Sequence, residues 1–278
     1  MVTAAPLSAP PRARSTRSSA PPLDQQRPTE TTTVHTRILR CMLAVDDSHA
    51  YWQRVDPSVP IAERARLAFE ERWFGTKSEA RIRTLMTDMA ERFDAYPEAL
   101  RLLQELGTVP AQWRSSICHL HTQLADPIYR RFTGEMLPTR RAQGQTTIDR
   151  EVVAGWVDRL EKDRWSSTTC IKFGSNLLAT AADAGLVVGK KDPRKLPVVS
   201  IPDGVIGYAL YLLRDVQIKG SLDDNAYLRS LGLSREAFGR LGARVPGVRV
   251  NELGGVFEIT WLESNLRDWG LRHIGGRS

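Results

Sequence analysis

The chain has 278 residues, of which 41% are hydrophobic and 26% charged, a composition typical of a globular protein rather than a fibrous or disordered one. Its formal net charge of +7 favours a polyanionic partner, either nucleic acid or an acidic protein surface. Three widely spaced cysteines, Cys41, Cys118 and Cys170, argue against a disulfide framework and favour reduced thiols in the cytoplasm.

Residues 1–33 are rich in Ala, Pro, Ser, Thr and Arg and almost free of large apolar residues. Such a segment cannot bury enough apolar surface to become ordered, so we expect a disordered basic tail. It lacks the apolar run of about 7 to 15 residues that a secretory signal needs. Its Arg-rich start also resembles a transit peptide, but it offers no convincing amphipathic helix.

Residues 34–145 are predicted to form an all-helical domain of about five or six helices, because apolar residues recur at helical intervals. The clearest helix runs over residues 76–93, where residues 76–79 have the spacing of a capping box. Tyr51 and Trp52 are expected in the core. The buried stripe of helix 76–93 is predicted to be Ile82, Leu85, Met86, Met89 and Phe93. The other helices are expected at 34–44, 60–73, 97–106, 110–124 and 126–136.

Cations surround the turn before helix 76–93, namely Arg72, Lys77, Arg81 and Arg83. They would either continue a DNA track or receive an acidic partner, and simple solvation of these charges fits the sequence equally well. Residues 138–145 have the composition of a linker and add two more cations, Arg140 and Arg141. We therefore place a domain boundary there.

Residues 146–203 follow the order of elements in a winged helix-turn-helix. A helix over 149–161 has an apolar stripe, and residues 162–165 form a turn. A second helix begins at Ser166 or Ser167, which are N-cap residue types, and ends before Gly185. Its packing stripe is predicted to be Ile171, Gly174, Leu178 and Ala181. Two short strands, 186–188 and 198–201, are expected around the basic loop, which is residues 189–195.

The surplus of cations in this unit lies at the turn and in the basic loop. If the second helix lay in a major groove, its hydroxyls and Lys172 would come near base edges and the basic loop would lie on phosphates. Winged helices also serve as dimerisation modules, and a lysine-rich loop can be merely solvated, so these alternatives stay open. The predicted DNA-contacting residues are Lys162, Arg164, Ser166, Ser167, Thr168, Thr169, Lys172, Lys190, Lys191, Arg194 and Lys195.

Residues 204–278 repeat the order of helices followed by a hairpin. An apolar helix over 205–216 is too short to span a membrane, and no other segment qualifies as transmembrane. Short helices are predicted at 225–231, 234–241 and 264–269, and strands at 248–251 and 256–261. Because the hairpin tip lacks Lys and Arg, we expect this smaller winged-helix-like unit to dock a protein rather than DNA. The predicted fold class is therefore mainly α.

Motifs for catalysis or cofactor binding are weak. Residues 185–191 resemble a phosphate loop but have one intervening residue too few and no Ser or Thr after the lysines. His119 and His121 lie two apart on a predicted helix and therefore face different ways, which argues against a metal site. No Gly-x-Ser-x-Gly elbow is present. We expect no cofactor, no metal and no enzymatic activity.

Four stretches carry a family resemblance: RWFGTKSEARIR at 72–83, WSSTT at 165–169, NLL at 176–178 and AGL at 184–186. With the order of segments over about 34–216, they resemble the BrxA family of bacterial BREX phage-defence systems. The resemblance implies a cytoplasmic DNA-binding protein whose helical first domain is similar to the antitermination factor NusB. It also implies partners, namely a site-specific DNA methyltransferase, a phosphatase-like protein and an ATPase. The tail and the part from Leu222 onward do not map onto the family core.

The preferred hypothesis is sequence-tolerant binding of double-stranded DNA by a non-enzymatic component of a phage-defence complex, in support of host methylation and phage exclusion. A transcriptional regulator is the nearest alternative, because a winged helix alone does not distinguish repression from assembly on DNA. An RNA-binding NusB-like factor and a structural adaptor for acidic proteins are the others.

Overall fold

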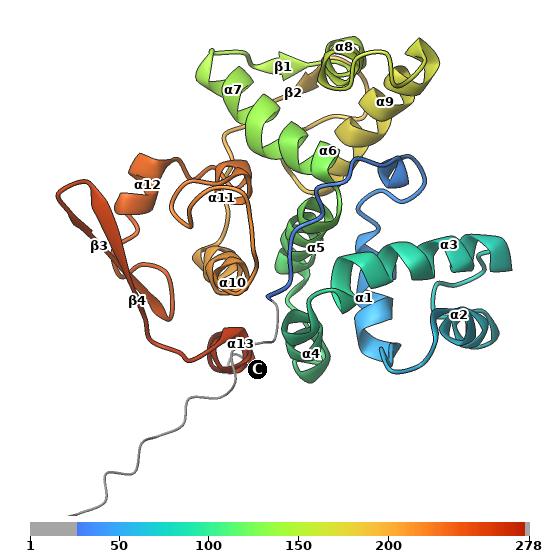
Figure 1. The fold of residues 1–278 in the computed structure, drawn as a ribbon, viewed down its shortest axis with the longest axis horizontal. Helices are drawn as coiled ribbons and strands as arrows, with labels where there is room; N and C mark the ends of the chain where they lie inside the picture. The colour runs from blue at the N-terminus through green and yellow to red at the C-terminus, as the bar shows by residue number, and fades with distance from the viewer. Residues whose placement is uncertain (1–26, 276–278) are drawn as a thin grey trace, which may run out of the picture.

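Helices dominate the architecture, and the strands form two small antiparallel pairs (Figure 1). The computed structural model describes residues 27–275. Three groups of elements surround the central helix α5: α1–α4, the unit with α8 and α9, and the C-terminal elements. The elements up to residue 142 are η1 (Arg37–Leu39), α1 (Val45–Arg54), α2 (Ile61–Glu70), α3 (Glu79–Met89), η2 (Ala90–Asp94), α4 (Pro97–Glu105), α5 (Ala111–Ala125), α6 (Pro127–Arg131), η3 (Phe132–Met136) and α7 (Leu137–Ala142). The remaining elements are β1 (Thr147–Ile148), α8 (Arg150–Leu160), α9 (Ser167–Asp183), β2 (Arg194–Lys195), α10 (Asp203–Arg214), α11 (Ala226–Ser230), α12 (Arg235–Gly239), β3 (Val248–Leu253), β4 (Val256–Trp261) and α13 (Leu266–His273).

The predicted helices between residues 60 and 136 are present, with ends shifted by a few residues. The stripe predicted for helix 76–93 is confirmed, because all five of its side chains are fully buried, and so are Tyr51 and Trp52. The N-cap differs from the expected capping box. Ser78, rather than Thr76, caps α3 by accepting a hydrogen bond from the backbone N–H of Arg81.

The helix predicted over 34–44 is wrong. Only the single 3-10 turn η1 forms, and the chain then runs without regular structure to Ala44. The reason lies on another helix, because the buried guanidinium of Arg92 donates hydrogen bonds to the carbonyl oxygens of Cys41, Met42 and Leu43. In a helix these carbonyls would bond to backbone N–H groups four residues further on.

The segment expected to be a linker, residues 138–145, is helical as far as Ala142. Pro138 lies just after the π-helical turn η3, and the helical backbone continues through it from α6 to α7. The side chain of Arg141 then donates hydrogen bonds to the carbonyl oxygens of Leu186 (2.6 Å) and Pro197 (3.0 Å). This helix is thereby tied to the segments on both sides of β2.

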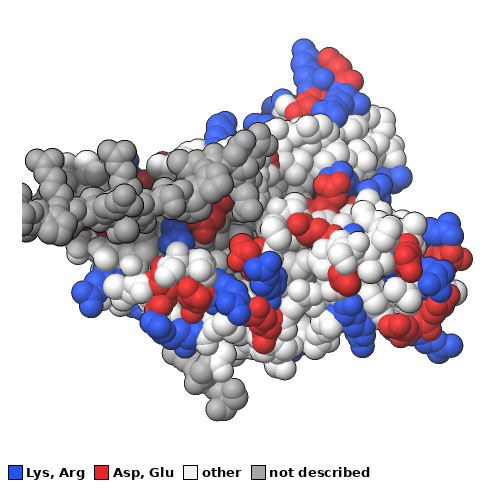
Figure 2. Space-filling model, turned by 60° about the horizontal axis from the view of Figure 1, so that its bottom comes forward, with Lys and Arg blue, Asp and Glu red and all other residues white. Residues whose placement is uncertain are grey.

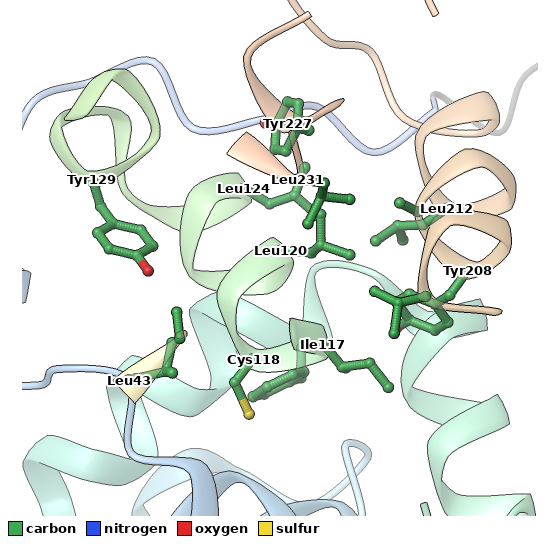
Figure 3. Close-up of a cluster of buried hydrophobic side chains, with 14 of the residues drawn as sticks. Leu43, Ile117, Cys118, Leu120, Leu124, Tyr129, Tyr208, Leu212, Tyr227 and Leu231 are labelled. Carbon is green, nitrogen blue, oxygen red and sulfur yellow. The ribbon is translucent and has the colours of Figure 1, made fainter. Parts of the chain in front are cut away.

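The core is built around α5, whose side chains are all buried from Ser116 to Ala125; Figure 3 shows some of them with their neighbours. Tyr208 and Leu212 of α10 reach it from one side, and Tyr129 of α6 from another. His119 is hydrogen-bonded through Nδ1 to the Tyr129 hydroxyl and through Nε2 to the Ser230 hydroxyl, both at 2.9 Å. Because burial disfavours the charged imidazole, it lowers the pKa of His119 to about 3.

His121 lies on a different side of α5 from His119, as their spacing predicted. Its Nδ1 is 2.8 Å from the carbonyl oxygen of Arg92, and its Nε2 is 2.8 Å from the Tyr208 hydroxyl. Burial lowers the pKa of His121 to about 4. Both histidines therefore serve as neutral hydrogen-bonding groups of the core.

In the C-terminal part, the predicted buried helix is confirmed as α10, whose side chains from Val205 to Leu213 are buried. Within residues 27–275 no helix has both the length and the apolarity needed to cross a bilayer. The predicted hairpin is present, and Gly254 and Gly255 turn it with positive φ angles of 60° and 80°. Because β3 extends to Leu253, the tip is only these two glycines.

Residues 27–33, expected to belong to a disordered tail, are packed against the core, while residues 1–26 lie outside the described part. The carboxylate of Glu30 is buried, accepts a hydrogen bond from the Tyr227 hydroxyl at 2.5 Å and lies 3.4 Å from Nε of Arg130. The backbone N–H of Thr31 donates to the carbonyl of Leu124. These partners lie far away in the sequence, so composition alone gave no sign of them.

Candidate nucleic-acid interface

Helices α8 and α9 pack directly on each other and carry the residues predicted to contact DNA. Asp149 caps α8, accepting a hydrogen bond from the N–H of Val152, and Ser166 caps α9, accepting one from the N–H of Thr169. The close approach of the two helices depends on Gly174, since a Cβ atom there would lie 2.6 Å from the carbonyl oxygen of Arg150. Gly185, with a φ of 75°, ends α9 as predicted.

The packing stripe of α9 differs from the prediction at one position. Gly174, Leu178 and Ala181 are buried as expected, but the Ile171 side chain is 44% exposed. Cys170, Phe173 and Leu177 are buried as well, and the ring of Phe173 lies 4.6 Å from that of Trp165 in the preceding turn. Ile171 instead lies on the face that α9 shows to solvent.

The strands of this unit are shorter than predicted and differently placed. Residues 198–201 form no strand, and Val198 is 91% exposed. The strand that returns from the basic loop is β2, which pairs with Val188 on one side and with β1 on the other. β1 precedes α8 and was not predicted, because two residues show no periodicity. The order along the chain is α7, β1, α8, α9, Val188 and β2.

The lysines are concentrated in this unit. The whole chain contains seven lysines, and five of them fall between residues 162 and 195. Those five are exposed, and none of them forms an ion pair within residues 27–275. They are Lys162, Lys172, Lys190, Lys191 and Lys195.

Arginines elsewhere behave differently, because most of those in the described part of the chain have a carboxylate partner. On the face shown in Figure 2, blue and red side chains are accordingly interspersed. The contrast distinguishes the five lysines at residues 162–195, which have no carboxylate partner among residues 27–275, from the paired arginines. The uneven spread of lysine along the sequence is the signal that could have revealed it.

Two arginines predicted to contact DNA form ion pairs within the protein. Arg194 has a side chain only 12% exposed, with Nε 3.3 Å from a carboxylate oxygen of Asp192. The other oxygen of Asp192 accepts a hydrogen bond from the backbone N–H of Arg150, which ties the basic loop to the start of α8. Arg164 pairs with Glu161 at 2.8 Å and donates to the carbonyl oxygen of Val34.

The predicted secondary cations are also largely engaged. Lys77 pairs with Asp47 at 2.8 Å, Arg83 pairs with Glu79, and Arg81 donates to the carbonyl oxygen of Arg40. Arg140 donates to the carbonyl oxygen of Thr147, and Arg141 has the two carbonyl partners described above. Arg72 is exposed on a turn with a φ of 53°. Together these contacts hold turns and helix ends in place.

Only the beginning of α9 is open to a large ligand. Ser166, Ser167, Thr168, Ile171 and Lys172 are exposed, and Thr169 is half-buried. Further along, the amide of Asn176 donates to the carbonyl oxygen of Ile38, so η1 covers this side of the helix. No group of His, Cys, Asp or Glu side chains within residues 27–275 is arranged to hold a metal ion. The open surface therefore consists of the first two turns of α9 and the basic loop.

The family model for BrxA matches residues 35–208, which include the helical elements from η1 to α9, the basic loop and the first turns of α10. The chain belongs to the BrxA family. Membership of the BrxA family implies a BREX-associated role, and the match confirms the family that the sequence resembles. The elements after α10, including the β3–β4 hairpin, lie outside the match. A comparison with curated proteins found no match.

Proposed function

We propose that this BrxA-family protein binds double-stranded DNA through the first turns of α9 and the basic loop, as a non-enzymatic component of a BREX system. The observation that carries the proposal is the group of five exposed lysines in the α8–α9 unit, none of which has an ion-pair partner in the described part of the chain. Lysines in such a position neutralise phosphates and release counterions, which supplies most of the affinity for a duplex.

The order of elements supports the interpretation of residues 146–203 as a winged helix. A helix, a strand, two helices, the bridging residue Val188 and the strand β2 follow one another, and β2 pairs both with Val188 and with the strand before α8. In such units the second helix of the pair enters the major groove. α9 would place Thr168 and Lys172 near base edges, while Lys190 and Lys191 contact phosphates beside the groove.

Partner proteins enter the proposal through family membership. A DNA methyltransferase, a phosphatase-like protein and an ATPase would act on DNA that this protein holds, in host methylation and phage exclusion. We also retain as proposals a helical NusB-like unit at 34–145, and a C-terminal unit at 204–278 that docks a protein. The transcriptional regulator and the RNA-binding factor remain the alternatives.

The test uses two variants that remove equal charge. One replaces Lys190, Lys191 and Lys195 with Ala, and the other replaces three exposed arginines that pair with neighbouring acids, Arg66, Arg101 and Arg240. We expect the lysine variant to bind any duplex more weakly and to lower the slope of log affinity against log salt by about 0.9 for each phosphate that is no longer neutralised. The arginine variant should keep the wild-type slope.

Competition with RNA separates the alternatives. Because the major groove of A-form RNA is too deep and narrow to admit a helix, double-stranded RNA should compete poorly with DNA. Equal effects of the two variants, or stronger competition by RNA than by DNA, would reject the proposed interface.

A further inference from the structure

The exposed face of α9 carries a large apolar side chain in an otherwise polar surface. Ile171 and Lys172 follow Thr168 by three and four residues, and Ser175 follows these two by four and three, so all four lie along one face of the helix. Thr168 and Lys172 are exposed, Ser175 is half-buried, and the Ile171 side chain is 44% exposed. Ile171 is the one large hydrophobic residue of α9, all of which the structure describes, with this degree of exposure.

A single exposed isoleucine has no meaning by itself, since much of any protein surface is apolar. The exposure of Ile171 becomes significant through its position, because Ile171 lies one turn into the helix that the proposed function places in the major groove. The base-edge atoms of that groove are hydrogen-bond donors and acceptors, with one apolar group among them, the C5-methyl of thymine. 5-Methylcytosine presents the same group at the same ring position. A branched aliphatic side chain can pack against this methyl group, whereas it cannot form hydrogen bonds with the donors and acceptors of the base edges.

We propose that Ile171 is a specificity-determining residue that contacts a pyrimidine C5-methyl group in the major groove. The inference rests on the proposed function, in that α9 must enter the groove for the contact to form. Thr168 lies about one turn before Ile171, and Lys172 directly follows it. These two side chains donate hydrogen bonds to base edges or phosphates, and Ile171 makes the apolar contact. The consequence is a preference for duplexes that present thymine to α9, added to a phosphate affinity that is independent of sequence.

The experiment removes the methyl group alone. Dissociation constants are measured for two duplexes of equal length, alternating A-T and alternating A-U, because every register of the first presents thymine to α9. Burial of one methyl group corresponds to an affinity difference of about fourfold, so the wild-type protein should bind the A-T duplex about fourfold more tightly. With Ile171→Ala the ratio of the two constants should fall to about one.

The control variant is Ile61→Ala, since Ile61 lies on α2 with a nearly identical exposed fraction of 43%. It should keep the wild-type ratio. Ratios, rather than absolute affinities, separate the effect of the Ile171 side chain from any difference in shape between the two duplexes. Because Ile171 is exposed, its replacement leaves the α8–α9 packing in place, and equal thermal unfolding of both variants checks this.

A second pair of duplexes identifies the source of the methyl group. Alternating C-G duplexes with and without 5-methylcytosine are compared in the same way. A gain from both methyl groups shows that Ile171 contacts the methyl whichever base carries it, and a gain from thymine alone assigns the contact to thymine. The inference is overturned if Ile171→Ala keeps the full preference for A-T over A-U, or if the wild-type protein shows none while binding both. If the wild-type protein binds no duplex at all, the proposed function falls with it.

Discussion

Single buried polar residues connect helices that are distant in the sequence. His119 joins α5 to α6 and α11, and His121 joins α5 to α10 and to the backbone of η2. Each imidazole has a hydrogen-bond partner at both ring nitrogens, which is what makes its burial tolerable. Burial keeps both rings neutral, so the stability of the fold depends on pH.

Stability should fall in mildly acidic solution. The folded-state pKa values of His119 and His121, about 3 and about 4, lie below the ordinary value of 6.5. Below pH 6.5 each of these histidines is therefore protonated in the unfolded chain but not in the folded protein. As a result, the free energy of unfolding falls by about 1.4 kcal/mol per pH unit for each histidine. The decrease ends as the pH approaches the folded values, and above pH 6.5 the contribution is constant.

The variant His121→Gln keeps a hydrogen-bonding side chain and removes one of these titrations. Measured by urea unfolding, its loss of unfolding free energy between pH 7 and pH 5 should be about 2 kcal/mol smaller than that of the wild type. Parallel curves for the two proteins would show that the unfolding equilibrium is insensitive to the burial of His121.

At the level of elements, the α8–α9 pair depends on backbone contact rather than on large side chains. Both helices have a glycine in their interior, and the two glycines differ in surroundings. A Cβ atom at Gly174 would meet the carbonyl oxygen of Arg150 at 2.6 Å, whereas at Gly155 its nearest neighbour is the guanidinium of Arg159, a flexible group, at 3.5 Å.

Alanine at these two positions should therefore have opposite effects. Gly174→Ala forces the helices apart and should lower the free energy of unfolding by about 1–3 kcal/mol, as overpacking does. Gly155→Ala should raise it by up to about 1 kcal/mol, because alanine favours the helix more than glycine does. Thermal unfolding of both variants measures the difference, and a stabilising Gly174→Ala would contradict the close approach.

Across the whole molecule, the segment at 27–33 links the first and last parts of the chain. Glu30 accepts hydrogen bonds from the Tyr227 hydroxyl and from the backbone N–H of Lys219, and Arg130 lies beside it. The buried hydrophobic residues form one cluster that runs from Ile38 to Ile274 and crosses the boundaries predicted at 145 and 203. We expect a single cooperative unfolding transition for this reason.

Replacing only the arginine of the buried ion pair should lower the free energy of unfolding more than replacing both charged residues. Arg130→Met leaves the Glu30 carboxylate buried without its cation, and we expect a loss of about 3–5 kcal/mol in unfolding free energy. The double variant Glu30→Gln with Arg130→Met should recover part of that loss, because no charge remains buried. If the double variant is the less stable of the two, the carboxylate is not the source of the cost.

The sequence by itself determined the features that depend on near neighbours. The helices from 60 to 136, the stripe from Ile82 to Phe93, the glycine that ends α9 and the turn at Gly254–Gly255 were all predicted. Caps, glycine turns and apolar periodicity act within a few residues, so their information is local. The family resemblance was carried by short stretches of the same kind.

Tertiary structure decided what depended on distant partners. Arg92 holds residues 41–43 out of a helix, Glu30 has partners near residues 130 and 227, and Phe173 is buried beside Trp165 while Ile171 is left in solvent. Among residues 27–275 most arginines have carboxylate partners, whereas the five lysines of the α8–α9 unit do not. A sequence states which residues carry charge, but pairing in three dimensions determines which charges remain available to a ligand.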